Sequence, residues 1–178
     1  MSARIAPGNR AEAGLFAWGF AQLAGRVART EAPKLFLTMG RRPKLFRGWL
    51  RFAGRLMPGG TLPRRDTELV ILRVAYLRQC AYEFEHHVRL GRRVGVSAAD
   101  LMRIQAYPAA AGWTARERAL LAAVDMLHAE QDLDDDTWSA LREHLDEACT
   151  VEFLMLAGHY EMLATFLNTL RIQPDRHR

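Results

Sequence analysis

The sequence is poor in cysteine and has no long apolar run. Its two cysteines, Cys80 and Cys149, lie far apart in a chain of 178 residues. They do not form the disulfide framework of a small secreted domain, and they are too few for a zinc site built mainly from thiolates. No segment reaches the roughly 18 to 20 apolar residues of a membrane-spanning helix, and the N-terminal segment lacks the apolar stretch of a signal peptide. We therefore expect a cytoplasmic protein with no membrane partner.

The sequence also lacks the basic and aromatic pattern of a nucleic-acid-binding protein. Its formal net charge is +5, and the excess comes mostly from scattered arginines, among them the pairs at 41–42, 64–65 and 92–93. No aromatic residues are interleaved with these pairs as they are in nucleic-acid readers. We expect a solvated basic surface and no nucleic-acid partner. Attraction of an anionic small molecule is the alternative interpretation.

Glycine and proline fall in clusters between apolar stretches, and this composition favours helices over a sheet sandwich. Hydrophobic residues make up 49% of the chain, enough for one sizeable core. Residues 1–12 are polar and include Pro7 and Gly8, so we expect a loosely ordered N-terminal arm. A single helical domain is expected over residues 13–178.

Apolar residues recur at helical spacing along most of that domain. Ser97 with Asp100, and Thr114 with Glu117, have the capping-box arrangement that begins a helix, and Pro43 suits a first helical turn. The pattern predicts an all-α orthogonal bundle of seven or eight helices. We expect a first apolar stretch around 15–23 that ends before Pro33, and a short helical turn at 34–39. The other expected helices are 43–56, a buried helix that begins at Asp66 or Thr67, 80–94, 97–107, 114–130, 134–145 and 146–170.

Three reactive side chains stand at i, i+3 and i+7 of one predicted helix: Cys80, Glu83 and His87. On a helix they project from the same face within two turns, so a thiol, a carboxyl and an imidazole would line one pocket wall. The helix N-terminus and an imidazolium favour the Cys80 thiolate, whereas a carboxylate opposes it. The direction in which the pKa of the thiol moves is therefore open.

The same segment has the residues that proton transfer needs. Glu83 and His87, four residues apart, can share a hydrogen bond that tunes the imidazole as a proton donor or acceptor. Glu68 is an acid in the strongly apolar preceding helix, where burial without a partner is costly. Either His87 or Arg64 explains its presence. By spacing alone, an exposed Glu–His pair and a buried structural cysteine are the favoured interpretation.

The segments RDTELVILRVA (65–75) and CAYEFEHHVRLG (80–91) resemble the core motif of carboxymuconolactone decarboxylase family proteins. The similarity extends from about Pro33 to the end and includes Gly158-His159-Tyr160 in the last predicted helix. The resemblance implies the alkylhydroperoxidase D-like helical bundle. It also implies a homo-oligomer, either trimer-based or dimeric.

Two branches of this superfamily imply different chemistry. In the alkylhydroperoxidase D branch, a Glu precedes Cys-x-x-Cys-x-x-x-His by eleven residues, and the two cysteines form a redox pair. Glu68, Cys80 and His87 match this motif, but Glu83 replaces the second cysteine, so no disulfide can form within it. In the lactone decarboxylase branch a Glu lies four residues before the His, as Glu83 does here.

Three functions follow from the resemblance. The first is metal-free, lyase-type proton transfer on a small organic acid, lactone or enolisable carbonyl compound, with His87 as base or acid, Glu83 and Glu68 orienting it and Cys80 lining the pocket. The second is a single-cysteine peroxidase in which Cys80 is oxidised to a sulfenic acid and regenerated by an external thiol. The third is a non-catalytic binding or assembly protein.

Other residues have less defined roles. The resemblance suggests that His159 faces the same pocket, although a hydrogen bond to a neighbouring backbone group explains it equally well. Tyr82 is expected at the pocket mouth. Glu68, Glu83, His87 and His159 could ligate one ion, but no H-E-x-x-H pattern is present, so we expect no metal and no cofactor.

Overall fold

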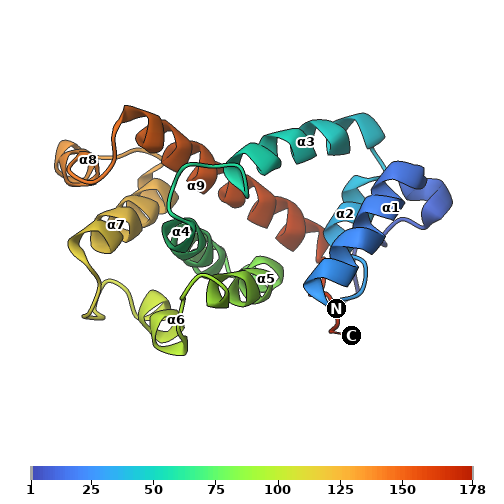
Figure 1. The fold of residues 1–178 in the computed structure, drawn as a ribbon, viewed down its shortest axis with the longest axis horizontal. Helices are drawn as coiled ribbons and strands as arrows, with labels where there is room; N and C mark the ends of the chain where they lie inside the picture. The colour runs from blue at the N-terminus through green and yellow to red at the C-terminus, as the bar shows by residue number, and fades with distance from the viewer. Residues whose placement is uncertain (1, 178) are drawn as a thin grey trace. The chain divides into compact units, whose positions relative to one another are not determined.

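Nine α-helices account for most of residues 2–177, the part of the chain that the computed structural model describes, and no named strand occurs among them. Figure 1 labels the helices in chain order. An all-α fold was predicted, and it is confirmed. No helix within these residues is both long and apolar enough to cross a membrane. The helices fall into two compact units, which are described separately.

The first unit contains residues 2–59 and 166–177. Its helices are α1 (Arg10–Ala28), α2 (Lys34–Met39), α3 (Pro43–Leu56) and the last turns of α9 (Glu147–Leu170). Asn9 caps α1 in a capping box with Glu12, so α1 begins within the segment 1–12 that was expected to be a loose arm. Gly8 also donates a backbone hydrogen bond to Leu37. Residue 1 lies outside the described residues.

Helix α1 buries its small residues and exposes its large ones. Leu15 and Leu23, whose spacing predicted the helix, are 67% and 61% exposed. At Gly25 an added Cβ would lie 2.6 Å from a backbone oxygen, so the inner face accepts only small side chains. That inner face consists of Ala13, Ala17, Ala21 and Gly25.

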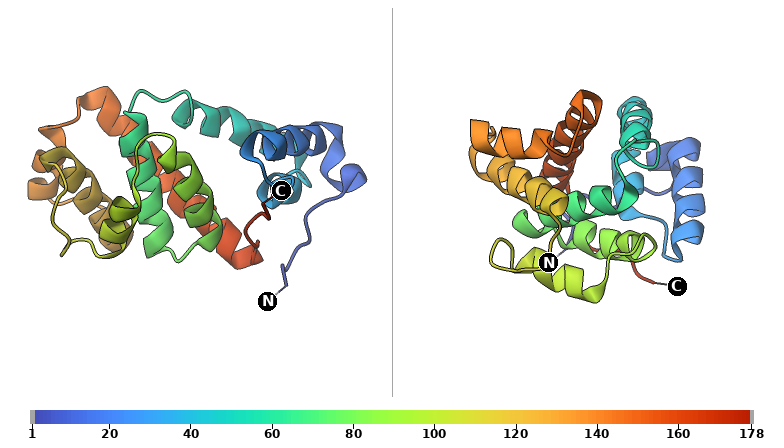
Figure 2. Two further views of the ribbon diagram at one scale, coloured as in Figure 1. Left: turned by 60° about the horizontal axis from the view of Figure 1, so that its bottom comes forward. Right: turned by 60° about the vertical axis from the view of Figure 1, so that its left-hand side comes forward.

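The second unit contains residues 60–165. Helix α4 (Arg64–Leu77) lies beside α5 (Ala81–Arg92), α6 (Ala98–Gln105) and α7 (Ala115–Glu130), as Figure 2 shows from two directions. Helix α8 (Asp135–Arg142) packs on α7, and most of α9 belongs to this unit. Ten consecutive residues of α4, from Asp66 to Ala75, are buried, which confirms the prediction of a central helix.

Several helix ends match the predicted signals. Ser97 and Thr114 form their capping boxes, and Pro43 occupies the first turn of α3. The expected start of α4 at Asp66 or Thr67 is wrong. The helix begins at Arg64 because the carbonyl of Pro63 already accepts a bond from the amide of Thr67, and Asp66 pairs with Arg116 instead of capping.

A buried apolar cluster lies between α4, α6 and α7. Trp113, in the loop before α7, is 4% exposed and belongs to this cluster. Its ring packs where α7 begins, so the loop before α7 is anchored by an aromatic side chain. The cluster consists of Leu69, Leu72, Val96, Ile104, Trp113 and Leu121.

Candidate functional site

A sharp corner between α4 and α5 positions the three reactive residues. Arg78 is the C-cap of α4, Gln79 adopts a left-handed conformation with φ 50°, and Cys80 is the N-cap of α5. The amide of Cys80 donates to the carbonyl of Ala75, which closes the end of α4. Cys80 is therefore held at the first residue of the new helix, just before the turn that carries Glu83.

Glu68 and His87 form a buried ion pair or hydrogen bond between α4 and α5. His87 Nδ1 lies 2.8 Å from Glu68 Oε2, and the two residues are 4% and 1% exposed. Arg64 Nη2 lies 3.5 Å from the other oxygen of Glu68 and is itself partly exposed. Both partners that the sequence suggested for Glu68 therefore contact it. His87 thus hydrogen-bonds one oxygen of Glu68, while the other oxygen has only the longer contact with Arg64.

Glu83 does not make the hydrogen bond with His87 that their spacing allows. Neither carboxyl oxygen of Glu83 has a hydrogen-bond partner within residues 2–177, and the residue is 2% exposed. The physical reason is that Glu68, from the neighbouring helix, already occupies His87 Nδ1. The structure thus separates the two carboxyl groups into a paired one and an unpaired one.

Burial determines the protonation of Glu83. It raises the pKa of the carboxyl from 4.5 to about 8, and the charge of Glu161 acts in the same direction. The Cys80 thiol and the Arg78 guanidinium lower it, but less than burial raises it. At pH 7 the side chain is therefore mostly a neutral carboxylic acid, able to donate a proton.

Cys80 is also buried and protonated. Burial, together with the charge of Glu83, raises the pKa of its thiol to about 12. The sequence left the direction of this shift open, and the structure resolves it against the thiolate. Cys149 is likewise a free thiol, half-buried in the first turn of α9, where it approaches the hydroxyl of Thr61.

His159 and Tyr160 approach the Glu68–His87 pair from α9. The ring of Tyr160 is perpendicular to that of His87, with centroids 5.1 Å apart, and equally close to that of His159. Burial, together with the charge of nearby His87, lowers the pKa of His159 to about 4, so this imidazole is neutral at pH 7. Tyr160 belongs to the Gly158-His159-Tyr160 motif, but the sequence predicted a pocket position only for His159. Only the packing of α9 shows that its ring lies between the two histidines.

Two neighbours in α5 project from another side of the helix. Tyr82 precedes Glu83 by one residue and is therefore turned about 100° away from it. It is buried rather than at a surface opening. His86 is half-buried, and its ring centroid lies 5.5 Å from that of His87.

An ion-pair chain lies beside the buried carboxyl. Arg78 contacts Glu161 at 3.2 Å, and His128 Nδ1 lies 2.7 Å from the other oxygen of Glu161. Sequence reasoning missed this chain because its members come from three different helices. As for metals, no three His, Cys, Asp or Glu side chains in residues 2–177 are placed to hold one ion.

Comparisons with known proteins agree with this architecture. Residues 43–126, which contain Glu68, Cys80, Glu83 and His87, match the model of the carboxymuconolactone decarboxylase family. No curated protein sequence matches the chain.

Several solved structures share the fold. A peroxidase-related protein from Ralstonia eutropha with an alkylhydroperoxidase AhpD core superposes with a TM-score of 0.84 at 20% identity, over 97% of this chain and 92% of that one. A protein of unknown function from Agrobacterium tumefaciens, described as a putative antioxidant defence protein AhpD, has a TM-score of 0.71 at 25% identity, over 76% of this chain and 94% of its own.

A third similar structure is the debrominase Bmp8 in complex with 2,3,4-tribromopyrrole. It has a TM-score of 0.80 at 17% identity, over 97% of this chain and 92% of that one. At this identity the likeness concerns the fold. The family match over residues 43–126, the segment that holds Glu68, Cys80, Glu83 and His87, together with these shared folds, supports the carboxymuconolactone decarboxylase and alkylhydroperoxidase D-like superfamily.

Proposed function

We propose that this protein is an enzyme that transfers protons on a small organic acid, lactone or enolisable carbonyl compound. One observation carries the proposal: the buried cluster holds two carboxyl groups in different surroundings. Glu68 is paired with His87 and Arg64, whereas Glu83 is unpaired and its pKa is raised to about 8. A carboxyl group whose pKa is raised by burial, one helical turn from a histidine that a second carboxyl group holds, is an arrangement in which one group can act as the acid and another as the base.

His87 is the base in this proposal. Its Nδ1 faces Glu68, and the tautomer with a proton on Nδ1 donates to that carboxylate and leaves Nε2 as the proton acceptor. Glu68 then stabilises the imidazolium that forms when Nε2 takes a proton from the carbon next to a carbonyl group. Arg64 contacts the other oxygen of Glu68 and supports the orientation of the pair.

Glu83 is the acid. As the substrate C–H bond breaks and its electrons move to the carbonyl oxygen, the O–H of Glu83 supplies the proton that this oxygen receives, and an enol forms. Imidazolium and carboxylate are left behind, and return of both protons restores the starting groups. In a decarboxylation, CO₂ leaves instead of the proton, and Glu83 protonates the resulting carbanion or enolate.

The experiment measures solvent deuterium exchange at carbon. Candidate lactones, 2-oxo acids and related carboxylic acids are incubated with the protein in D₂O, and C–H signals and CO₂ release are followed. We expect His87→Ala and Glu83→Gln each to reduce turnover by about 10²-fold or more, while Cys80→Ser retains it. Full activity of folded His87→Ala would contradict the proposal.

A single-cysteine peroxidase is the second candidate, supported by the likeness to the putative antioxidant defence protein from Agrobacterium tumefaciens. Here Cys80 would attack a hydroperoxide, lose an alcohol and become a sulfenic acid that an external thiol reduces. The raised pKa of the thiol argues against it, because the thiolate is the nucleophile. Hydroperoxide consumption with dithiothreitol that disappears in Cys80→Ser would favour this candidate. A protein that turns over neither substrate class would be a binding or assembly protein.

A further inference from the structure

Basic and acidic residues are concentrated in different segments of this chain, although the arginine pairs are spread along the whole sequence. Between Glu31 and Asp66 the sequence has nine lysines and arginines and no acidic residue. Five of these cations are exposed along α3, and none of the five pairs with a carboxylate within residues 2–177. We call them the basic α3 surface: Arg42, Lys44, Arg47, Arg51 and Arg55.

The basic α3 surface also exposes apolar side chains. Leu45 is 64% exposed and stands among the cations at the start of α3. The Arg47 guanidinium lies 5.2 Å from the ring centre of Phe16 of α1, which is 50% exposed. Cations mixed with exposed apolar residues are typical of a contact surface rather than of a purely solvated face.

The opposite charge is concentrated in another part of the chain. From Asp125 to Glu152 the sequence has ten acidic residues and one arginine. Trp138, in the middle of α8, is 43% exposed among these acids. A surface tryptophan is a preferred partner for an arginine guanidinium. The exposed acids around α8 that form no ion pair within the described residues are Asp132, Asp134, Asp135, Asp136 and Glu143. We call this group, with Trp138, the acidic α8 surface.

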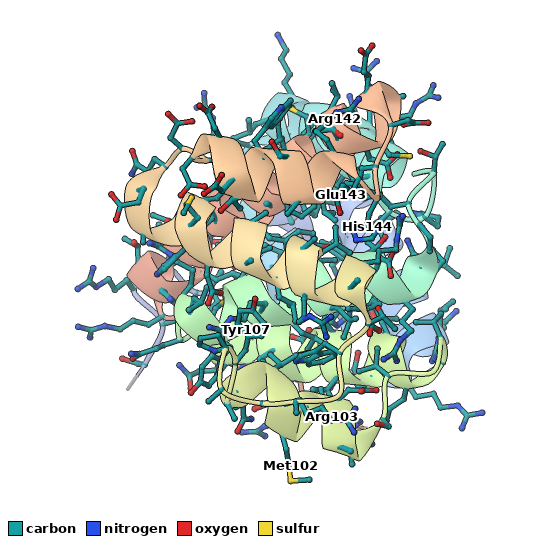
Figure 3. All side chains as sticks on the ribbon, turned by 90° about the vertical axis from the view of Figure 1, so that its left-hand side faces the viewer. Met102, Arg103, Tyr107, Arg142, Glu143 and His144 are labelled. Atoms are coloured by element: carbon teal, nitrogen blue, oxygen red, sulfur yellow. The ribbon has the colours of Figure 1, made fainter. Side chains whose placement is uncertain are left out.

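A groove lies next to the acidic α8 surface. It has a volume of about 320 Å³, and four alanines of α7 and α8 line it. Tyr107, Glu143 and His144, which are labelled in Figure 3, stand at its sides. Arg118 also lines the groove, but its guanidinium donates to the carbonyl of Trp113. The groove therefore offers an approaching chain a lining of alanines with one acidic side chain, Glu143, together with the cation of Arg118.

We propose that the basic α3 surface of one copy of this protein docks on the acidic α8 surface of a second copy. Leu45 enters the alanine-lined groove, the surrounding cations face the acids of α8, and an arginine stacks on Trp138. Pairing of either surface with itself would place like charges together, which is unfavourable. Joining the two different surfaces makes a heterologous contact, which produces a ring where the rotation closes.

Two charge-reversed variants test this interface. The first carries Lys44→Glu and Arg47→Glu, and the second carries Asp136→Lys and Glu143→Lys. Mass is measured by light scattering after size exclusion. We expect wild type to be an oligomer at ~50 mM NaCl and to lose mass at ~500 mM, because salt screens exposed charges. Each variant alone should lose at least one subunit of mass.

The decisive step is the mixture of the two variants. Lys44→Glu/Arg47→Glu subunits meet Asp136→Lys/Glu143→Lys subunits with intact original surfaces on one side and swapped charges on the other, so a two-subunit complex should form that neither variant forms alone. Arg92→Glu/Arg93→Glu, with the same change in net charge at the end of α5, should keep the wild-type mass. Circular dichroism checks that each variant is folded.

Three results would overturn the proposal: a monomeric wild type at low salt, an unchanged mass for folded Lys44→Glu/Arg47→Glu, or no association in the mixture. Anionic vesicles and a short DNA duplex are included as competing ligands. If Lys44→Glu/Arg47→Glu loses binding to either of these while its own mass is that of wild type, the basic α3 surface serves another partner and the proposed interface is wrong.

Discussion

Replacing Glu83 by glutamine should stabilise the protein, and the gain should depend on pH. The folded state raises the pKa of this carboxyl from 4.5 to about 8. Between these values the folded protein holds a proton that the unfolded chain has lost. Stability of the wild type therefore falls as pH rises through this window and levels off above pH 8.

The size of the effect follows from the same values. One pKa unit corresponds to about 1.4 kcal/mol. Relative to pH values below 4.5, the raised pKa of Glu83 therefore lowers the stability by about 3 kcal/mol at pH 7, where the folded protein still holds the proton, and by about 5 kcal/mol above pH 8. Glutamine has nearly the same shape and no charge. We therefore expect Glu83→Gln to differ little from wild type near pH 4.5 and to gain about 3 kcal/mol at pH 7.

Urea denaturation at about pH 5, 7 and 9 measures this difference through the midpoint at constant m value. Since both proteins share every other titrating group, those groups cancel in the comparison. Glu85→Gln removes an exposed carboxyl from the same helix and controls for the change in net charge. A difference between Glu83→Gln and wild type that stays constant from pH 5 to 9 would refute the reasoning, because it would mean that Glu83 is not held neutral by burial.

Three further predictions follow from particular contacts. In native protein, iodoacetamide should modify Cys149 at least about 10²-fold faster than Cys80, because Cys80 is 1% exposed and its pKa is raised to about 12. Mass spectrometry of the peptides measures both rates. Fast labelling of Cys80 would favour the peroxidase. Asp125→Ala should destabilise the fold by about 3 to 5 kcal/mol, since Arg73, which is 4% exposed, loses the carboxylate that contacts it at 2.6 Å. Urea unfolding measures the loss of stability. A loss below about 1 kcal/mol would contradict the prediction. Trp113→Ala should lower the free energy of unfolding by about 3 to 5 kcal/mol in the same assay, because it leaves a cavity in the apolar cluster. An unchanged stability would mean that the loop does not depend on this ring.

Local signals in the sequence predicted much of the fold. The capping boxes at Ser97 and Thr114 formed because their hydrogen bonds join residues only three apart. The apolar periodicity predicted the helices for the same reason. It failed to predict which face of α1 is buried, since Leu15 and Leu23 are exposed while small residues face inward. The width of the gap between two helices, and not hydrophobicity alone, decides which side chains fit there.

The candidate site was likewise predicted only in part by the sequence. Residue spacing alone placed Cys80, Glu83 and His87 within two turns of one helix, and the resemblance added Glu68. Spacing also suggested a Glu83–His87 hydrogen bond, which the structure replaces with one between Glu68 and His87. A helix places neighbours four residues apart on one face, but it does not decide which of two competing partners a side chain contacts.

By itself, the sequence determined the helical class of this protein, most of its helix ends and the residues that carry its family motif, because these depend on side chains within about one or two turns of each other. Only the tertiary structure decided the protonation of the site. The pairing of Glu68 with His87, the isolation of Glu83 and the protonated state of Cys80 all depend on how α4, α5 and α9 exclude water around them. Burial by distant segments sets the cost of each charge, and no local pattern in the sequence encodes that cost.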